Sequence, residues 1–304
     1  MTPAEAAFWS RVNRKAASLS PDLARRILAA FKAIADSLTD AELIRFIESG
    51  QADRILDEAL LDRAFQPVRS ELVKETEGAV RYFARDLPKA GRIDGTLAIS
   101  FDVLNPRVLD AIRQLDSKVV TTLKDDARQV VREAVERGLS EGKNPTAIAR
   151  EIRSTVGMSP AQAKAVANYR AELESGKRGL QRQLRDRRFD KAALTPERID
   201  RMVNSYEKRM TAYHAETVSR TATLDSLKLG QKLSVEDAVA KGIYDPSRLV
   251  KRWVTVGDDR VRDEHVAMNG EVVPWDQPYS NGEEIPGSGT FNCRCLSRFY
   301  QKAA

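Results

Sequence analysis

The sequence predicts a mainly α-helical protein that ends in a small α+β domain. Apolar residues recur at steps of three and four through most of the first 240 residues, which places them on one face of each helix. After Pro246 the pattern changes to short runs of β-branched and aromatic residues, separated by Gly and Pro. We therefore expect an elongated helical body with a long helical hairpin, followed by the small α+β domain.

The first helix boundaries are indicated by capping residues. Ser20-Pro21 opens a segment with a long apolar stripe, so we expect a helix to begin there. Thr39 and Glu42 have the spacing of a capping box, in which each side chain accepts a hydrogen bond from the other residue's backbone N–H. The short helix that follows is expected to end near Gly50.

The next helix is expected to run toward Pro88, with Pro67 as a kink or break, because proline removes a backbone donor. Residues 88–105 form an irregular or extended connection, and Asn105-Pro106 begins another helix. That helix carries the clearest apolar stripe of the chain, which indicates lengthwise packing on other helices. Its members are Val119, Val120, Leu123, Ala127, Val130, Val131, Ala134, Val135 and Leu139.

Two further helices complete the helical part. Asn144 begins a short helix, and Ser159 with Gln162 forms a second capping box. Thr195 opens a long helix whose apolar stripe we expect to end near Gly230. A stripe of this length is typical of an arm of a hairpin or bundle, and packing is its usual cause.

The last part of the chain is predicted to form a small antiparallel unit. Residues 249–256 and 270–275 are strand candidates, and 260–268 suit a short helix. A long loop rich in Gly and Pro then leads to a final strand at 291–300. On this pattern we divide the chain into an N-terminal helical region (1–104), a helical region with a basic insertion around 166–212 (105–230), and the C-terminal α+β domain (231–304).

Composition limits the classes of protein that fit. The charged fraction is 31%, and the longest apolar runs fall far short of the roughly 20 residues that cross a bilayer. The N-terminal residues have no apolar core of a secretory signal. The two cysteines, Cys293 and Cys295, are too close together for an ordinary disulfide framework. We expect a soluble protein of the cytoplasm that does not bind membranes.

The formal net charge is +6, and most of the excess lies in residues 177–188. This segment has six basic residues against one acidic residue, Asp186. It could bind DNA through the phosphates, form a solvated face, or contact an acidic protein surface. The candidate nucleic-acid-binding residues are Lys177, Arg178, Arg182, Arg185, Arg187 and Arg188.

The last forty-odd residues hold both cysteines and one of the two histidines. His265, Cys293 and Cys295 offer the imidazole and thiolate ligands that zinc takes in tetrahedral sites, and an aspartate could supply a fourth. We expect Cys293 and Cys295 to alternate on a strand with their side chains facing opposite ways, so that binding of one ion by both would need a bulge or a tight turn. The alternative is a packed polar cluster in which the cysteines are small buried residues and His265 forms hydrogen bonds within the fold.

The carboxylates of the stretch GDDRVRDEH allow a catalytic interpretation, because nucleases use such groups to hold a divalent metal. A solvated acidic turn, with Asp259 paired to a nearby arginine, is the commoner structure. The sequence contains no phosphate-binding glycine loop, and the two histidines are not placed for a hydrolase triad. We expect a protein that is not an enzyme, with a metal-dependent enzyme acting on nucleic acid as the alternative.

One ordered set of residues resembles a known family. Trp253, Asp259-Arg260, Arg262, His265, Gly270 and Asn292-Cys293-Arg294-Cys295 follow the order seen in the phage Mu F-like minor head proteins, also called the phage head morphogenesis domain. Residues 130–152 and 215–230 are similar to upstream segments of that family, so the resemblance extends over about 105–300. The family usually reads Arg-Thr-Glu where this chain has Arg220-Thr221-Ala222.

The resemblance implies a structural component of a virion that is needed for normal head assembly. It implies a place inside the head near the portal vertex after assembly in the host cytoplasm, with the portal or the major capsid protein as partner and contact with double-stranded DNA. We expect the motif residues to form one structural cluster that closes the C-terminal domain, by zinc or by hydrogen bonds. The cluster comprises Trp253, Asp259, Arg260, Arg262, His265, Asn292, Cys293 and Cys295.

Overall fold

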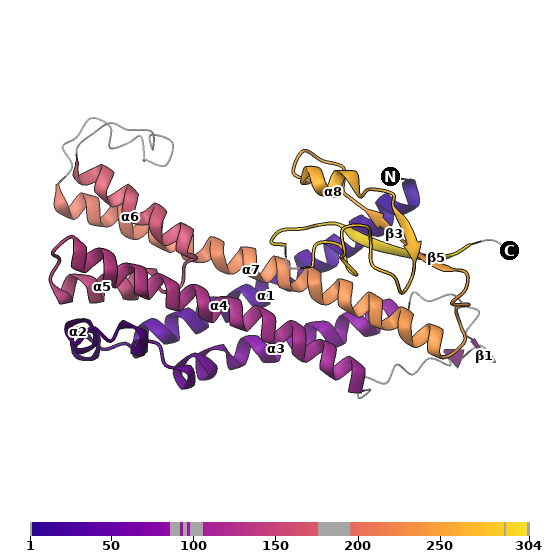
Figure 1. Cartoon of the computed structure of the whole chain (residues 1–304), viewed down its shortest axis with the longest axis horizontal. Helices are drawn as coiled ribbons and strands as arrows, with labels where there is room; N and C mark the ends of the chain where they lie inside the picture. Colours follow the sequence, from indigo (N-terminus) through magenta and orange to yellow (C-terminus); the bar gives the residue numbers. More distant parts are fainter. Residues whose placement is uncertain are drawn as a thin grey trace. The chain divides into compact units, whose positions relative to one another are not determined.

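The computed structural model describes residues 2–85, 92–93, 96–97, 106–175, 195–288 and 290–302. The predicted class is confirmed: the chain is mainly α with a small antiparallel sheet at its C-terminal end (Figure 1). The helices are α1 (Pro3–Ser37), α2 (Asp40–Glu48), the 3-10 helix η1 (Ala52–Arg54), α3 (Glu58–Ala84), α4 (Pro106–Ser140), α5 (Pro145–Thr155), α6 (Pro160–Glu174), α7 (Pro196–Ala240) and α8 (Asp263–Ala267). The strands are β1 (Arg92–Ile93), β2 (Thr96–Leu97), β3 (Leu249–Val254), β4 (Val272–Pro274) and β5 (Leu296–Gln301).

The chain forms two compact units, and each is assembled from separate segments. Unit 1 contains residues 1–24, 68–119 and 216–304, and unit 2 contains 25–67 and 120–215. The long helices α1, α3, α4 and α7 each contribute residues to both units. The three predicted domain ranges, 1–104, 105–230 and 231–304, stay predictions.

The predicted caps at Asn144 and Ser159 are present, whereas the predicted Thr39–Glu42 box is half formed, because the Glu42 carboxylate accepts from the Thr39 hydroxyl and not from its backbone N–H. Thr39 Oγ1 accepts a hydrogen bond from the backbone N–H of Glu42, and Asn144 caps α5 in the same way through Ala147. Ser159 and Gln162 form the reciprocal capping box of α6. These polar side chains satisfy backbone donors that the first turn of a helix leaves without partners.

The predicted helix start at Pro21 was wrong and Pro67 does not break its helix, because both prolines lie inside continuous helices; a kink at Pro67 stays a prediction. Each is flanked by buried apolar residues, such as Leu23 after Pro21 and Phe65 before Pro67, each 0% exposed. Packing of these side chains outweighs the local loss of one hydrogen bond, so the helix continues through the proline.

The predicted end of the long helix near Gly230 was also wrong, since α7 continues to Ala240. Gly230 lies where α7 packs against α3, and a Cβ there would come within 2.7 Å of Ala79 Cβ and of Val80 N. Glycine is needed at this position for close approach of two helices in unit 1, and it does not end the helix.

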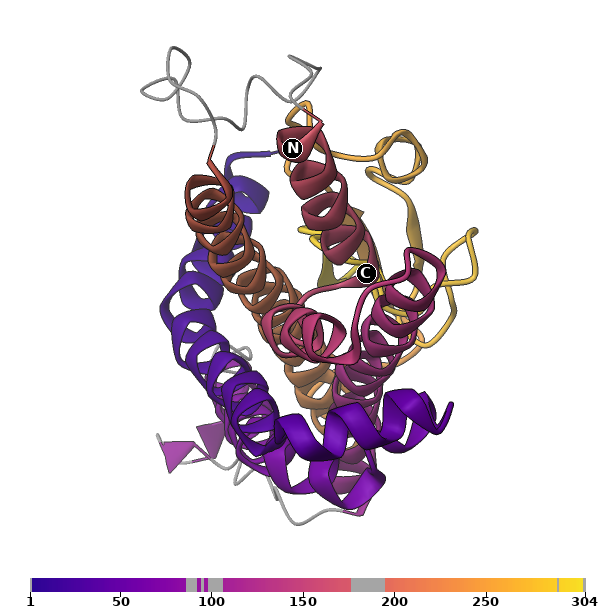
Figure 2. The same cartoon turned by 90° about the vertical axis from the view of Figure 1, so that its left-hand side faces the viewer.

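In unit 2, α6 and the first part of α7 form the two arms of the predicted hairpin. They lie side by side in both views (Figures 1 and 2) and share one apolar core. Tyr169 of α6 meets Tyr206 of α7 edge to face, with 5.1 Å between ring centroids. Arg170 adds an ion pair with Asp200 across the two arms at 2.8 Å.

In unit 1, the sheet has the order β4-β3-β5 and is antiparallel throughout. The N-terminal turns of α1 pack against it (Figure 1): Trp9 Nε1 donates to the backbone carbonyl of Arg294 at 2.9 Å. The buried carboxylate of Glu5 forms an ion pair of 3.3 Å with Arg252 on β3. Residues from the two ends of the chain therefore build one core.

Within the described residues, none of the helices combines the length and the apolar character that crossing a bilayer requires.

Candidate metal centre in the C-terminal module

The C-terminal module, residues 249–302, encloses a small aromatic core. Trp253 on β3 is 0% exposed and is the largest fully buried side chain described. It packs edge to face on His265 and Tyr279, with ring centroids 5.3 and 5.0 Å away. Cys293 and Cys295 belong to the same buried cluster. The structure thus places both cysteines and His265 around one indole ring.

Three potential metal ligands converge beside Trp253. The ligand atoms of His265, Cys293 and Cys295 all lie within 4.8 Å of one another. His265 Nδ1 is 3.5 Å from Cys293 Sγ and 3.7 Å from Cys295 Sγ. The three residues are 3–4% exposed. Among the described residues, no fourth His, Cys, Asp or Glu belongs to this group.

The backbone before β5 explains how two alternating cysteines come together. The final strand was predicted from residue 291, but β5 begins at Leu296, after both cysteines. Asn292 has φ +60°, a left-handed conformation that bends the chain, and its N–H donates to Thr221 Oγ1 on α7. The expectation that the two cysteines face opposite ways was wrong, because residues two apart share a face of a strand, and Cys293 and Cys295 lie in the irregular segment between this bend and β5.

Gly287 gives Cys293 its space. Gly287 has φ +70°, and a Cβ on it would lie 2.1 Å from Cys293 Sγ. No side chain fits at that distance, so glycine is required both by conformation and by packing. The loop 276–290, which was expected only to connect β4 to β5, thus contributes a wall of the cysteine pocket.

A buried lysine anchors the same turn to α7. Lys228 is 4% exposed, and its ammonium group donates to the carbonyl oxygens of Pro286 (2.9 Å) and Cys293 (3.3 Å). Asp225 lies 3.4 Å from the ammonium and balances its charge. Burial raises the pKa of Asp225, while Lys228 and Lys118 oppose that shift.

The two thiols differ in acidity. Cys293 accepts a hydrogen bond from Cys295, and this contact lowers the pKa of Cys293 to about 5, against the opposing effect of burial. The same contact, together with burial, raises the pKa of Cys295. A thiolate is the form in which cysteine binds metals, and the site favours it at one of the two sulfurs.

The structure brings together only part of the predicted cluster. Asp259 and Arg260 are exposed and lie outside the buried group. The ion pair of this turn joins Arg294 to Asp258 through two contacts of 2.7 and 2.6 Å. Arg262 is exposed and donates to the backbone carbonyl of Phe291 at 3.0 Å. These residues fix the turn over the site from outside.

Sequence reasoning missed three contributors: Lys228, Gly287 and Tyr279. The Tyr279 hydroxyl shares a hydrogen bond of 2.9 Å with Ser297, and burial raises its pKa. A lysine within an amphipathic helix and a glycine within a loop have many commoner explanations. An aromatic residue inside a loop of Gly and Pro was the available signal, because such a loop seldom needs a large apolar side chain on its surface.

A second buried carboxylate lies beside the segment that resembles the family. Ala222 replaces the usual glutamate there, and the next residue, Thr223, donates a hydrogen bond of 2.8 Å to Glu75 on α3. Glu75 is 4% exposed, and burial raises its pKa to about 7.

The basic candidates for nucleic-acid binding, Lys177, Arg178, Arg182, Arg185, Arg187 and Arg188, lie outside the described residues.

The fold and the site define a helical chain closed by a small sheet whose core holds a buried histidine and cysteine cluster. Residues 175–298 match the family model described as Phage Mu protein F like protein. The match confirms the resemblance for α7 and most of the C-terminal module; residues 105–174 lie outside it. Over these residues, which are less than half of the chain, the chain is similar to phage head morphogenesis proteins. Comparison with curated proteins gave no match. Comparison with solved structures gave none either.

Proposed function

We propose that this protein is a minor head protein of a tailed phage or prophage, with a structural role in head assembly. The match over residues 175–298 is the observation that carries the proposal. The protein is assembled in the host cytoplasm and lies inside the head near the portal vertex. The portal or the major capsid protein is its partner, and residues 177–188 contact packaged DNA through its phosphates.

Deletion of the gene from the parent phage or prophage tests this role. Induced lysates are expected to contain aberrant or empty heads, and the full chain supplied in trans restores filled heads. Chemical cross-linking of purified heads is expected to join the protein to the portal or the major capsid protein. Normal numbers of filled, infectious heads without the gene would contradict the proposal.

We further propose that His265, Cys293 and Cys295 hold a zinc ion that stabilises the C-terminal module. The set is one nitrogen and two sulfur ligands, which is zinc chemistry, and it is already gathered within 4.8 Å. Water would occupy the remaining tetrahedral position. The ion would join α8 to the turn before β5, and a module of about fifty residues has a small core that benefits from such a link.

Metal analysis of the purified full chain tests the zinc site. About one zinc per chain is expected, and cobalt substitution is expected to give the absorption of a thiolate-bound ion. A strong chelator should lower the unfolding temperature, because a metal that binds only the folded state stabilises it. Cys293→Ser should lose the metal, whereas His214→Gln, at the other histidine, should retain it. If protein purified with zinc contained no bound metal, the zinc proposal would be wrong, and His265, Cys293 and Cys295 would form a packed polar cluster without a metal.

A zinc-dependent enzyme acting on nucleic acid is the second candidate. The open coordination position favours it, since catalytic zinc sites keep one position for water. Burial of all three donors favours the structural role, because a substrate needs access to the metal. Incubation of the zinc-loaded protein with single- and double-stranded DNA distinguishes the two. Cleavage that Cys293→Ser abolishes, in a variant that stays folded, would establish the enzyme.

A further inference from the structure

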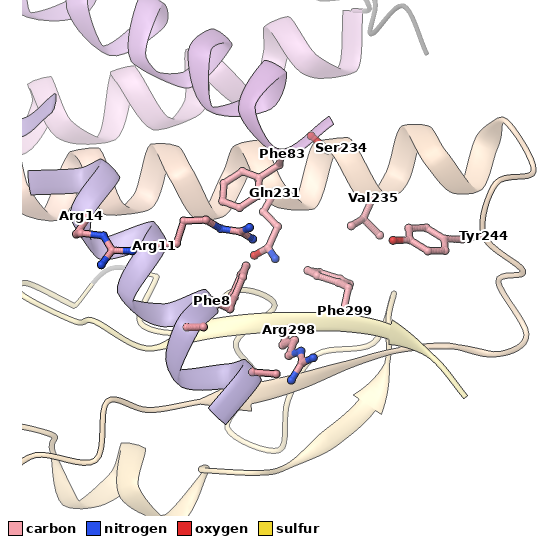
Figure 3. Close-up of a pocket in the computed structure, with 12 residues that line it drawn as sticks. Phe8, Arg11, Arg14, Phe83, Gln231, Ser234, Val235, Tyr244, Arg298 and Phe299 are labelled. Carbon is pink, nitrogen blue, oxygen red and sulfur yellow. The ribbon is translucent and has the colours of Figure 1, made fainter. Parts of the chain in front are cut away.

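A cavity of about 590 Å³ lies in unit 1 between α1, the second half of α7 and β5 (Figure 3). It is separate from the cysteine cluster. Its size is that of a small ligand pocket. Phe8, Phe83 and Phe299 supply apolar walls from three different elements, α1, α3 and β5.

The charge of the cavity has one sign. Arg11, Arg14 and Arg298 line it, and among the described residues no acidic side chain does. Arg11 and Arg14 are exposed. The carboxylate of Glu5, whose side chain is 4% exposed, lies 4.0 Å from Arg298 and is already paired with Arg252. Guanidinium groups in this arrangement favour carboxylates, which they bind with two parallel hydrogen bonds.

A buried amide points into the cavity. Gln231 is 9% exposed, and Figure 3 shows its side-chain amide directed between Phe8 and Phe299. The hydrogen bonds of the described residues give this amide no partner. The residue is buried as a whole, but its amide atoms are not among the buried polar atoms that lack a partner, so the amide is open to the cavity, where a ligand with a donor and an acceptor would bond to it. The Tyr244 hydroxyl also faces the cavity and has no hydrogen-bond partner among the described residues.

These groups together match an extended acidic peptide. A peptide main chain offers one N–H and one C=O per residue, which is what a glutamine amide recognises. Acidic side chains match the arginines, and an apolar side chain fills the space between phenyl rings. A single-stranded nucleic acid needs a basic groove that follows several phosphates, whereas these arginines surround one cavity.

We propose that this cavity binds an acidic peptide segment of a partner protein, with its main chain on Gln231 and an apolar side chain among Phe8, Phe83 and Phe299. This inference does not depend on the zinc site or on the role in head assembly, because it rests on the cavity alone.

The test uses the full chain and a fluorescein-labelled peptide, Asp-Glu-Phe-Glu-Asp, followed by fluorescence anisotropy. Two comparison peptides are Asn-Gln-Phe-Gln-Asn, without charge, and Asp-Glu-Gly-Glu-Asp, without the ring. Each is expected to bind at least about tenfold more weakly. Gln231→Met keeps the volume and removes the amide, and should weaken binding of the acidic peptide about tenfold. Arg14→Ser should do the same.

Two controls keep the result interpretable. Arg26→Ser, at an exposed arginine of α1 that does not line the cavity, should leave the affinity unchanged. Thermal melts establish that each variant is folded, and Tyr244→Phe provides a second conservative change. Absence of binding at millimolar peptide, or equal binding of the uncharged peptide, overturns the proposal. Tighter binding of oligothymidylate that Gln231→Met abolishes would also overturn it, in favour of nucleic acid.

Discussion

Lys228 of α7 donates a hydrogen bond to the backbone carbonyl of Cys293, 65 residues further along the chain, at 3.3 Å. This contact holds the turn that presents the cysteines against the helix that precedes the module. The geometry of the candidate metal centre thus depends on a residue outside the module itself.

Replacing Lys228 by Met should lower the free energy of unfolding by about 3–5 kcal/mol, because Asp225, whose side chain is only 14% exposed, would lose the counter-charge 3.4 Å away. The double variant Lys228→Met, Asp225→Leu should recover part of that loss. Lys232→Met is the control: it breaks a partly exposed pair with Glu284 and should cost under about 1 kcal/mol. Urea denaturation measures these three variants and the single variant Asp225→Leu, which completes the double-mutant cycle. Strict additivity of the two changes at 225 and 228 would contradict the pairing.

Gly287→Ala should destabilise the module by more than the strain of a positive φ alone. The new Cβ would lie 2.1 Å from Cys293 Sγ, so we expect the free energy of unfolding to fall by about 3–4 kcal/mol and metal binding to weaken. Gly282→Ala is a matched control, with φ +85° but no atom within 4 Å of the new Cβ, and should cost about 1–2 kcal/mol. Tryptophan fluorescence during denaturation reports the result, and equal losses at the two sites would refute the collision.

The sequence predicted elements better than it predicted contacts. The cap at Ser159 was predicted correctly because a helix cap depends only on residues within one turn. Gly230 misled because a glycine that ends a helix and a glycine that lets two helices approach have the same sequence signature. Cys293 and Cys295 could not be assigned to one site with His265, since their position depends on the left-handed backbone of Asn292 and on the hydrogen bond that its N–H donates to Thr221 on a distant helix.

Glu75 should make stability depend on pH in a defined window. Its folded-state pKa of about 7 lies above the ordinary 4.5, owing first to burial, with Glu71 and Asp22 adding and Thr223 and Lys74 opposing. Between these values the folded chain keeps a proton that the unfolded chain releases. The free energy of unfolding should therefore fall as pH rises from about 4.5 to about 7, by about 3 kcal/mol at most, and then level off.

Glu75→Gln should flatten that decrease, because glutamine can still accept the hydrogen bond from Thr223 and does not ionise. Glu77→Gln, beside it on α3 but partly exposed, should retain the decrease. The measurement is urea denaturation at half-unit steps from pH 4.5 to pH 8. A wild-type profile that rises through this window would show that Glu75 is ionised in the folded protein.

The basic segment 177–188 should bind DNA without sequence preference. Release of counterions from the phosphates predicts a steep fall in affinity between about 50 and 200 mM salt. The test variant changes Arg182, Arg185, Arg187 and Arg188 to Ser, and should lose most binding. The control variant removes the same charge elsewhere, by changing Arg26, Arg63, Arg150 and Arg201 to Ser. Equal loss of DNA binding in both variants would assign the binding to net charge. A flat salt dependence would exclude contacts between this segment and the phosphates.

The hydrogen bond from Trp9 to Arg294 spans 285 residues and has a consequence for synthesis of the chain. At roughly 5–20 residues per second, the partner of Trp9 leaves the ribosome about 15–60 s after the indole itself. During that interval the apolar face of the N-terminal turns of α1 lacks the C-terminal residues against which it packs. Unit 1 can close only after β5 has been synthesised, so a nascent chain that stalls before β5 exposes apolar helix surface to chaperones.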